Sequence, residues 1–278
     1  MEDVRNAPAW SGHIPCSLLQ LKGNDALDLL QRISTNDVAG MTDGTVRKTL
    51  LVSDKGRLID TIWVVLRGTE LLLVCSTGMS GTVQQFLERY IIMDDVTVHD
   101  LFGATTVRIK IGTGSEGLPV DYFGHPGVII FKEPHDAPES ETAGFELWRI
   151  LNGIPVAGRE VVQDFNPLEL DLWDWISFTK GCYIGQEVIA RLDTYQKIQR
   201  SLCLVSGTGR ILEGTTLQDQ SGKEVGRVTS IVQNGNTFIG LAVVRRSAAV
   251  ANTRLQDKTG GTSVTVEQVF QKEKNGTD

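Results

Sequence analysis

The sequence predicts an α+β protein whose C-terminal part is an antiparallel β-barrel or sandwich. Three β-rich runs separated by turn sequences lie between residues 46 and 76, and helical patterns of apolar residues flank them. Beyond residue 200 the chain changes to short β runs joined by hairpin turns. The length of 278 residues corresponds to about two domains, three at most, because a domain averages roughly 100–200 residues.

The first segment, CSLLQLKGNDALDLLQRISTNDV, predicts a short strand followed by a helix. Asn24 is a good N-cap because its side-chain oxygen can accept an N–H of the first helical turn. The apolar residues of this helix recur at helical spacing, which predicts one buried face. They are Ala26, Leu29, Leu30 and Ile33.

The next three runs, VRKTLLVS, LIDTIWVVL and ELLLVCS, predict an antiparallel meander. A helix with an apolar stripe over residues 83–91 follows, and VTVHDLF and TTVRIKI return to strand. This β-β-β-α-β-β order over residues 46–111 predicts a compact unit of the split ferredoxin-like kind.

Residues 112–143 are rich in Gly, Pro and Glu around one short apolar run, which indicates a loop and connector. They contain G-x-G-x-x-G at Gly112, Gly114 and Gly117. A dinucleotide fingerprint must open a helix, and here a Pro-containing segment follows. A flexible loop is therefore expected instead of a nucleotide site.

Two further helical segments precede the β-rich end. FELWRILNGIPV predicts a helix or strand that ends at Gly153, and GQEVIARL predicts a helix after Gly185. Beyond Arg200, Asn-Gly at 234–235 and Gly-Gly at 260–261 are strong hairpin signals.

Composition excludes some functional classes. A net charge of −7 and a pI near 5.2 argue against a protein that neutralises nucleic-acid phosphates. No run approaches the ~18 apolar residues of a membrane span, and the start has no basic leader, so a soluble cytoplasmic protein is expected. The four cysteines stand far apart with no C-x-x-C pair, which predicts neither a zinc site nor a disulfide framework.

The stretch SFTKGCYIGQEVIAR, residues 177–191, surrounds Cys182 with glycines and cations. Nearby cations or a helix N-terminus stabilise a thiolate, and Lys180 and Arg191 supply cations. The alternative is a buried structural cysteine, which spacing alone favours because free cysteine is among the most buried residue types. An anionic ligand would also find a local cationic cluster in this region: Lys180, Arg191, Lys197 and Arg200.

Three carboxylates are candidate site residues. Glu169 and Glu187 are candidates for holding a heterocycle through paired N–H donors, because a charged acceptor binds such donors well. Alternatively, Glu187 charges the first turn of its helix and Glu169 lies on a solvated face. Asp60 stands in the strand run GRLIDTIWVV, where a lone carboxylate is uncommon, although most such residues face water.

The Cys182 stretch resembles the signature K-G-C-Y-x-G-Q-E of the YgfZ family of folate-binding proteins, whose eukaryotic members serve mitochondrial iron–sulfur cluster assembly. Other segments resemble the family as well, so the likeness covers nearly the whole chain: LKGNDALDLLQRISTNDV, SDKGRLIDTIWVV, NGIPVAGRE, NPLELDL, GRVTS and IGLAVVR. The family is similar in fold to the T-protein of the glycine cleavage system, an aminomethyltransferase that acts on tetrahydrofolate.

The resemblance implies three lobes around a central folate pocket. Residues 1–45 with 140–200 would form a discontinuous folate-binding first lobe, residues 46–139 a ferredoxin-like second lobe, and residues 201–278 the β-barrel. It implies tetrahydrofolate or another reduced folate as cofactor and iron–sulfur client or assembly proteins as partners. Neither a direct nucleic-acid contact nor a membrane contact is expected, and the family's link to tRNA modification runs through iron–sulfur enzymes.

Residue roles follow from the same resemblance. Cys182 matches the family cysteine, which implies a reactive or cluster-contacting thiol, and Asp60 matches one carboxylate of the T-protein's G-G-x-x-D-D strand. The residues implied in folate binding are Glu169, Lys180, Tyr183, Gln186, Glu187 and Arg191.

The T-protein's pterin-holding glutamate lies in R-x-E-x-G, and this chain has Leu151 at that place. A leucine cannot accept N–H bonds, so folate would be held in the usual geometry only if Glu169, Glu187 or Asn152 substitutes.

Two functions are thereby expected. In the first, the protein binds a reduced folate and supports the maturation or repair of iron–sulfur proteins through Cys182. In the alternative it is a tetrahydrofolate-dependent aminomethyl- or methyltransferase in which Asp60 takes or gives a proton. A structural scaffold without either activity is the third class.

Overall fold

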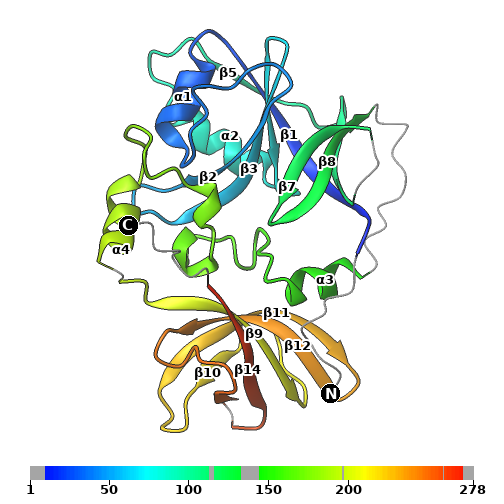
Figure 1. Ribbon diagram of the computed structural model, residues 1–278, viewed down its shortest axis with the longest axis vertical. Helices are drawn as coiled ribbons and strands as arrows, with labels where there is room; N and C mark the ends of the chain where they lie inside the picture. The colour runs from blue at the N-terminus through cyan, green and yellow to red at the C-terminus, as the bar shows by residue number, and fades with distance from the viewer. Residues whose placement is uncertain (1–9, 113–115, 133–143, 196, 259, 272–278) are drawn as a thin grey trace.

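The computed structural model describes residues 10–112, 116–132, 144–195, 197–258 and 260–271. Figure 1 shows two bodies, a large twisted sheet flanked by helices and a β-barrel below it, with a layer of short helices and loops between them. Within the described residues, the sheet has eight strands and the barrel six. The predicted α+β class with a C-terminal antiparallel barrel is confirmed.

The predicted meander forms one side of the sheet. Its strands β2 (Val46–Val52), β3 (Leu58–Arg67) and β4 (Glu70–Cys75) pair antiparallel in sequence order. Strand β1 (His13–Lys22) then pairs with β4, and it also pairs with β5 (Thr97–Asp100) and β6 (Thr106–Ile111). Residues 13–22 therefore lie in the same sheet as β2 to β6, and the lobe boundaries given above stay a prediction.

Helices α1 (Ala26–Ile33) and α2 (Ser80–Glu88) contribute to one apolar core beside this sheet. The four predicted core residues of α1 are buried, as their spacing predicted. The predicted N-cap was wrong: the residue before the helix is Asp25, and the Asn24 amide donates to Asp95 Oδ2 at 2.8 Å. Asn24 thus fastens the loop before β5 instead of capping α1.

The predicted connector over residues 112–143 is wrong for its middle part. Strands β7 (Leu118–Tyr122) and β8 (His125–Lys132) form a hairpin that extends the sheet beyond β6. The Gly- and Pro-rich composition concealed the inward-facing Val120, Tyr122 and Ile129. Gly117 leads into β7 and not into the helix that a dinucleotide fingerprint must open. Gly114 and residues 133–143 lie outside the described residues.

The intermediate layer consists of helices α3 (Phe145–Leu151) and α4 (Gln186–Thr194) and the 3-10 turns η2 (Pro167–Leu170) and η3 (Trp173–Trp175). Figure 1 shows these segments between the sheet and the barrel. One continuous core joins all three layers, with Leu50 and Ile109 from the sheet, Trp148 from α3 and Leu241 from the barrel among its members.

The barrel closes in the order β10-β11-β12-β9-β14-β13. Its strands are β9 (Arg200–Thr208), β10 (Thr216–Gln218), β11 (Glu224–Asn234), β12 (Thr237–Arg245), β13 (Arg254–Asp257) and β14 (Ser263–Phe270). The predicted hairpins at 234–235 and 260–261 lie between β11 and β12 and between β13 and β14. No helix in the described part of the chain is long and apolar enough to cross a membrane.

Candidate functional site

The loop that carries Cys182 is packed against the turn between β2 and β3. Gly185 precedes α4 with φ of +79°, and a Cβ there would lie 2.4 Å from the Ser53 carbonyl oxygen. Ile184 N donates to the Arg32 carbonyl at 3.1 Å, which ties the same loop to the end of α1. Only glycine combines this φ with so close an approach, so the second glycine of the motif is needed to seat the loop.

Cys182 itself is exposed on this loop, which contradicts the alternative of a buried structural cysteine. The ammonium of Lys180 does not serve the thiol: it donates to the Ser34 and Asn36 carbonyls at 2.8 and 2.7 Å, just past the C-terminus of α1. A cation is favoured at a helix C-terminus. Burial lowers the pKa of Lys180 to about 8, and its ammonium lies 5.4 Å from the centre of the Tyr183 ring.

The predicted cluster of cations around Cys182 does not form as one site. Arg191 pairs with Glu187 at 2.7 Å on an exposed face of α4, where the Glu187 side chain is 84% exposed. Arg200 instead binds Glu169, and Lys197 lies over the ring of Tyr195. Glu187 and Arg191 are four residues apart on one helix face, and this spacing explains why Arg191 pairs there.

Glu169 is buried, so the alternative of a solvated face is wrong. Its Oε1 accepts from Arg200 Nε at 2.8 Å, and its Oε2 accepts from Arg200 Nη2 at 2.9 Å and from Asn166 N at 3.1 Å. Both oxygens thus hold the start of η2 to the barrel. Its predicted role toward a heterocycle remains untested, and these contacts leave little accepting capacity.

A cavity of about 240 Å³ lies between the sheet and the intermediate layer. We call it the aromatic cavity, because four aromatic side chains line it: Trp63, Tyr122, Phe123 and Phe145. Its polar lining consists of Cys16, Thr61, Ser76, Thr77, Glu146 and Arg159. Burial raises the pKa of the Cys16 thiol to about 12, so this thiol stays protonated at neutral pH.

Trp63, in the wall of the aromatic cavity, has a side-chain donor without a partner. Its side chain is buried and stacks on Tyr122 with ring centres 5.4 Å apart. Its Nε1–H has no hydrogen-bond partner among the described residues. Buried polar groups are nearly always paired, so this donor is an exception, and its nitrogen has almost no accessible surface toward the cavity.

Asp60 lies directly behind the wall of the aromatic cavity. It is buried, which contradicts the alternative that it faces water. Its Oδ1 accepts from Thr61 N at 2.9 Å and its Oδ2 from Ser76 N at 3.1 Å, and both donors belong to lining residues. Burial raises the pKa of Asp60 to about 6 despite these bonds.

Glu146, which no sequence pattern singled out, is the carboxylate that lines the aromatic cavity. Burial would raise the pKa of Glu146, but hydrogen bonds and charge from Arg149 and Arg159 outweigh it and lower the pKa. The position of Arg149 in the R-x-E-x-G segment was the available signal. Leu151, Asn152, Glu169 and Glu187 do not line this cavity.

A second cavity, of about 810 Å³, opens between the turn from β2 to β3, the intermediate layer and the barrel, and Glu169 lies in its wall. Neither cavity is lined by Cys182. In the described part of the chain, no three His, Cys, Asp or Glu side chains gather where they could hold a metal ion.

Two family models match the chain: the GCVT N-terminal domain over residues 3–111 and the CAF17 C-terminal β-barrel domain over residues 200–270. A chloroplastic protein of Arabidopsis thaliana, named as a candidate transferase, is 28% identical over 84% of this chain. The chain spans 65% of that relative's length, which is less than two thirds. The human mitochondrial iron–sulfur cluster assembly factor IBA57 is 26% identical, with 82% of this chain and 75% of IBA57 covered.

The fold is that of a solved T-protein. The crystal structure of the glycine cleavage system aminomethyltransferase T from Bartonella henselae matches with a TM-score of 0.73 at 17% identity, covering 94% of this chain and 86% of that one. This likeness confirms the predicted T-protein-like fold. The chain thus matches a GCVT N-terminal domain in its first part and a CAF17-type barrel in its last part, and it is similar to IBA57 over most of its length.

Proposed function

We propose that the protein binds a reduced folate in the aromatic cavity and supports the maturation or repair of iron–sulfur proteins. The observation that carries the folate assignment is the aromatic lining of this cavity together with the Glu146 carboxylate and the Arg159 guanidinium. The iron–sulfur assignment is supported by the similarity to a human protein named as an iron–sulfur cluster assembly factor.

The residues of the aromatic cavity suit the chemistry of a folate. Aromatic side chains favour a flat ring system between them. The Glu146 carboxylate suits N–H donors, and the Arg159 guanidinium suits a carboxylate. A bound reduced folate would supply nitrogen atoms that carry a one-carbon unit.

Cys182 is assigned in this proposal to the contact with an iron–sulfur cluster or its protein carrier. Its exposure on a loop held at Lys180 and Gly185 leaves the thiol accessible to a large partner. Clusters are usually held by several thiolates, so one cysteine would share the cluster with ligands from a partner.

Titration of the full chain with tetrahydrofolate, 5-methyltetrahydrofolate and 5-formyltetrahydrofolate tests the pocket. The change Trp63→Phe is expected to weaken the binding by about fivefold, since the smaller ring loses aromatic contact worth on the order of 1 kcal/mol. The affinity can be measured by calorimetry.

Trp175→Phe is the matched control, because Trp175 packs 5.0 Å from Trp63 in the same aromatic cluster but does not line the cavity. It should leave the affinity within about twofold. Leu151→Glu should also have little effect. If the wild type bound none of these folates, the folate assignment would be wrong. A large gain of folate affinity in Leu151→Glu would indicate that the pterin binds at the end of α3 instead.

A tetrahydrofolate-dependent aminomethyltransferase is the second candidate, and the observation that favours it is the pKa of Asp60, raised to about 6 by burial. A carboxyl with such a pKa can exchange a proton near neutral pH.

Cells that lack the protein can separate the two candidate functions through the activity of their iron–sulfur enzymes. If the iron–sulfur proposal holds, Cys182→Ala should fail to restore this activity while Asp60→Asn restores it. The two variants should keep folate binding, which is the control for folding. A transferase is favoured by the opposite outcome, with Asp60→Asn inactive in folate-dependent transfer and Cys182→Ala active. The third class, a structural scaffold, would be supported only if the protein bound neither folate nor thiol reagents.

A further inference from the structure

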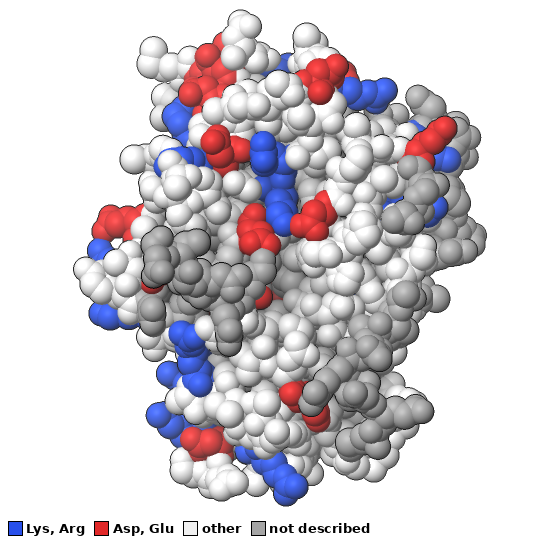
Figure 2. Space-filling view, viewed as in Figure 1, with Lys and Arg blue, Asp and Glu red and all other residues white. Residues whose placement is uncertain are grey.

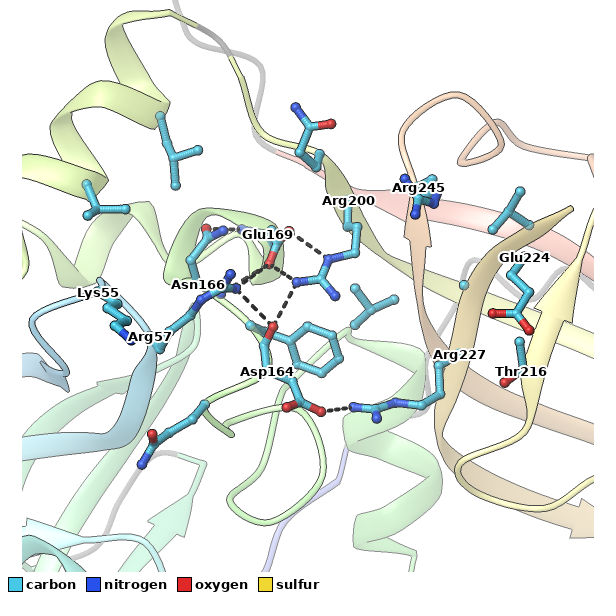
Figure 3. Close-up of a pocket in the computed structure, with 18 residues that line it drawn as sticks. Lys55, Arg57, Asp164, Asn166, Glu169, Arg200, Thr216, Glu224, Arg227 and Arg245 are labelled. Carbon is cyan, nitrogen blue, oxygen red and sulfur yellow. Dashed lines mark hydrogen bonds and ion pairs between the residues drawn. The ribbon is translucent and has the colours of Figure 1, made fainter.

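The larger cavity is basic, although the protein as a whole is acidic. We call it the basic cleft, because five cationic side chains from the turn after β2 and from the barrel line it: Lys55, Arg57, Arg200, Arg227 and Arg245. Figure 3 shows Lys55 and Arg57 on one side of the cleft and Arg227 and Arg245 on the barrel side. Its lining includes three acidic residues, Asp164, Glu169 and Glu224.

Two of the arginines form a fixed wall. Arg200 makes a bidentate pair with Glu169 at 2.8 and 2.9 Å, and Arg227 pairs with Asp164 at 2.7 Å. Their guanidinium carbons lie 4.8 and 5.3 Å from the centre of the Phe165 ring. These contacts hold both guanidinium groups in place before any ligand arrives, which reduces the entropy lost on binding.

The remaining cations are not neutralised within the cleft. Neither Lys55 nor Arg245 makes a side-chain hydrogen bond or ion pair with a described residue. Arg57 donates to the Asp164 carbonyl at 3.0 Å and lies 4.0 Å from Glu169, which Arg200 already engages. The third acid, Glu224, is bound to Lys258 outside the lining at 2.9 Å. The cleft therefore has an excess of positive charge.

Apolar side chains complete the cleft: Val188 and Leu192 from α4, and Val225 and Val243 from the barrel. A cavity of about 810 Å³ is of the size that holds a small organic molecule. The surroundings do not suit a long nucleic acid, because the chain carries a net charge of −7 and acidic and basic side chains are interspersed over the described face in Figure 2.

We propose that the basic cleft binds a small molecule that carries clustered anionic oxygens, phosphate or carboxylate, beside an apolar part. Guanidinium groups match both kinds of oxygen in a bidentate manner. This site shares no lining residue with the aromatic cavity, so it is independent of the folate assignment.

The test is calorimetric titration of the full chain at constant ionic strength with tripolyphosphate and, in a separate arm, with citrate. Saturable binding of one equivalent of either probe is expected, and the tighter probe identifies phosphate or carboxylate as the preferred oxygen source. The change Arg245→Gln should lower the affinity for the tighter probe about tenfold, because one charge-assisted contact is lost. Lys55→Gln should act in the same direction.

Arg254→Gln is the control, because it removes the same charge from a residue that is exposed on β13 and does not line the cleft. It should leave the affinity within about twofold. Equal losses in Arg245→Gln and Arg254→Gln, or no saturable binding of either probe, would overturn the proposal. Tighter binding of single-stranded RNA than of both probes, lost in Arg245→Gln, would overturn it in favour of a nucleic-acid surface.

Discussion

Replacing Arg149 by methionine is expected to lower the free energy of unfolding by about 3–5 kcal/mol, the usual cost of removing one partner of a buried ion pair. Arg149 on α3 has no exposed surface. It donates to Glu146 at 3.1 and 2.8 Å, to Glu160 at 3.4 Å and to Ser230 Oγ at 2.8 Å. Its loss would leave Glu160, which is also fully buried, as an uncompensated charge.

Urea unfolding at neutral pH measures this effect. The double change Arg149→Met with Glu160→Gln should recover part of the loss, because a neutral amide removes the stranded charge. Arg191→Met is the control, since its pair with Glu187 is exposed and is expected to contribute less than about 0.5 kcal/mol. A cost near that of the control would show that Glu160 is satisfied without Arg149.

This network also explains how the aromatic cavity is attached to the barrel. Ser230 lies on β11, where the register against β12 shifts between Val228 and Ser230. Such a bulge re-aims side chains, and the Ser230 hydroxyl donates to Glu160 Oε1 at 2.6 Å. Through Arg149 the same network holds Glu146 in the cavity wall. Loss of Arg149 is therefore expected to affect the pocket as well as stability.

Sequence patterns predicted those parts of the fold that depend on contacts between residues close in the sequence. The meander over 46–76 and the two hairpin turns of the barrel were predictable, because alternation and Asn-Gly or Gly-Gly turns decide them over a few residues. The β7–β8 hairpin was missed because its tip is built from Phe123, with φ of 50°, and Gly124, with φ of 87°. A bulky residue in that conformation gives no turn signal in a sequence.

The candidate site was less predictable than the fold. Lys180 finds its partners at Ser34 and Asn36, about 145 positions earlier in the chain, and no local pattern could reveal that contact. The aromatic cavity, to which β3 contributes Trp63 and α3 contributes Glu146, arises only when segments far apart in the sequence fold together. The pairing of Glu187 with Arg191, in contrast, follows from their spacing of four residues on α4.

The second large expected effect concerns pH and Asp60. Burial raises the pKa of Asp60 from 3.8 to about 6, so between these values the unfolded chain has lost a proton that the folded chain keeps. Ionisation then stabilises the unfolded state, and the free energy of unfolding falls as pH rises through this range. The full loss from this one group is about 3 kcal/mol and is complete above pH of about 6.

Comparison with Asp60→Asn isolates this contribution, because all other titrating groups are common to both proteins. Urea unfolding between pH 4.5 and 7.5 should show the wild type losing stability relative to Asp60→Asn as pH rises, by about 2 kcal/mol. Parallel curves would show that the pKa of Asp60 is ordinary. In that case the carboxyl would be fully ionised behind Thr61 and Ser76 at neutral pH, and the transferase alternative would lose the proton donor that supports it.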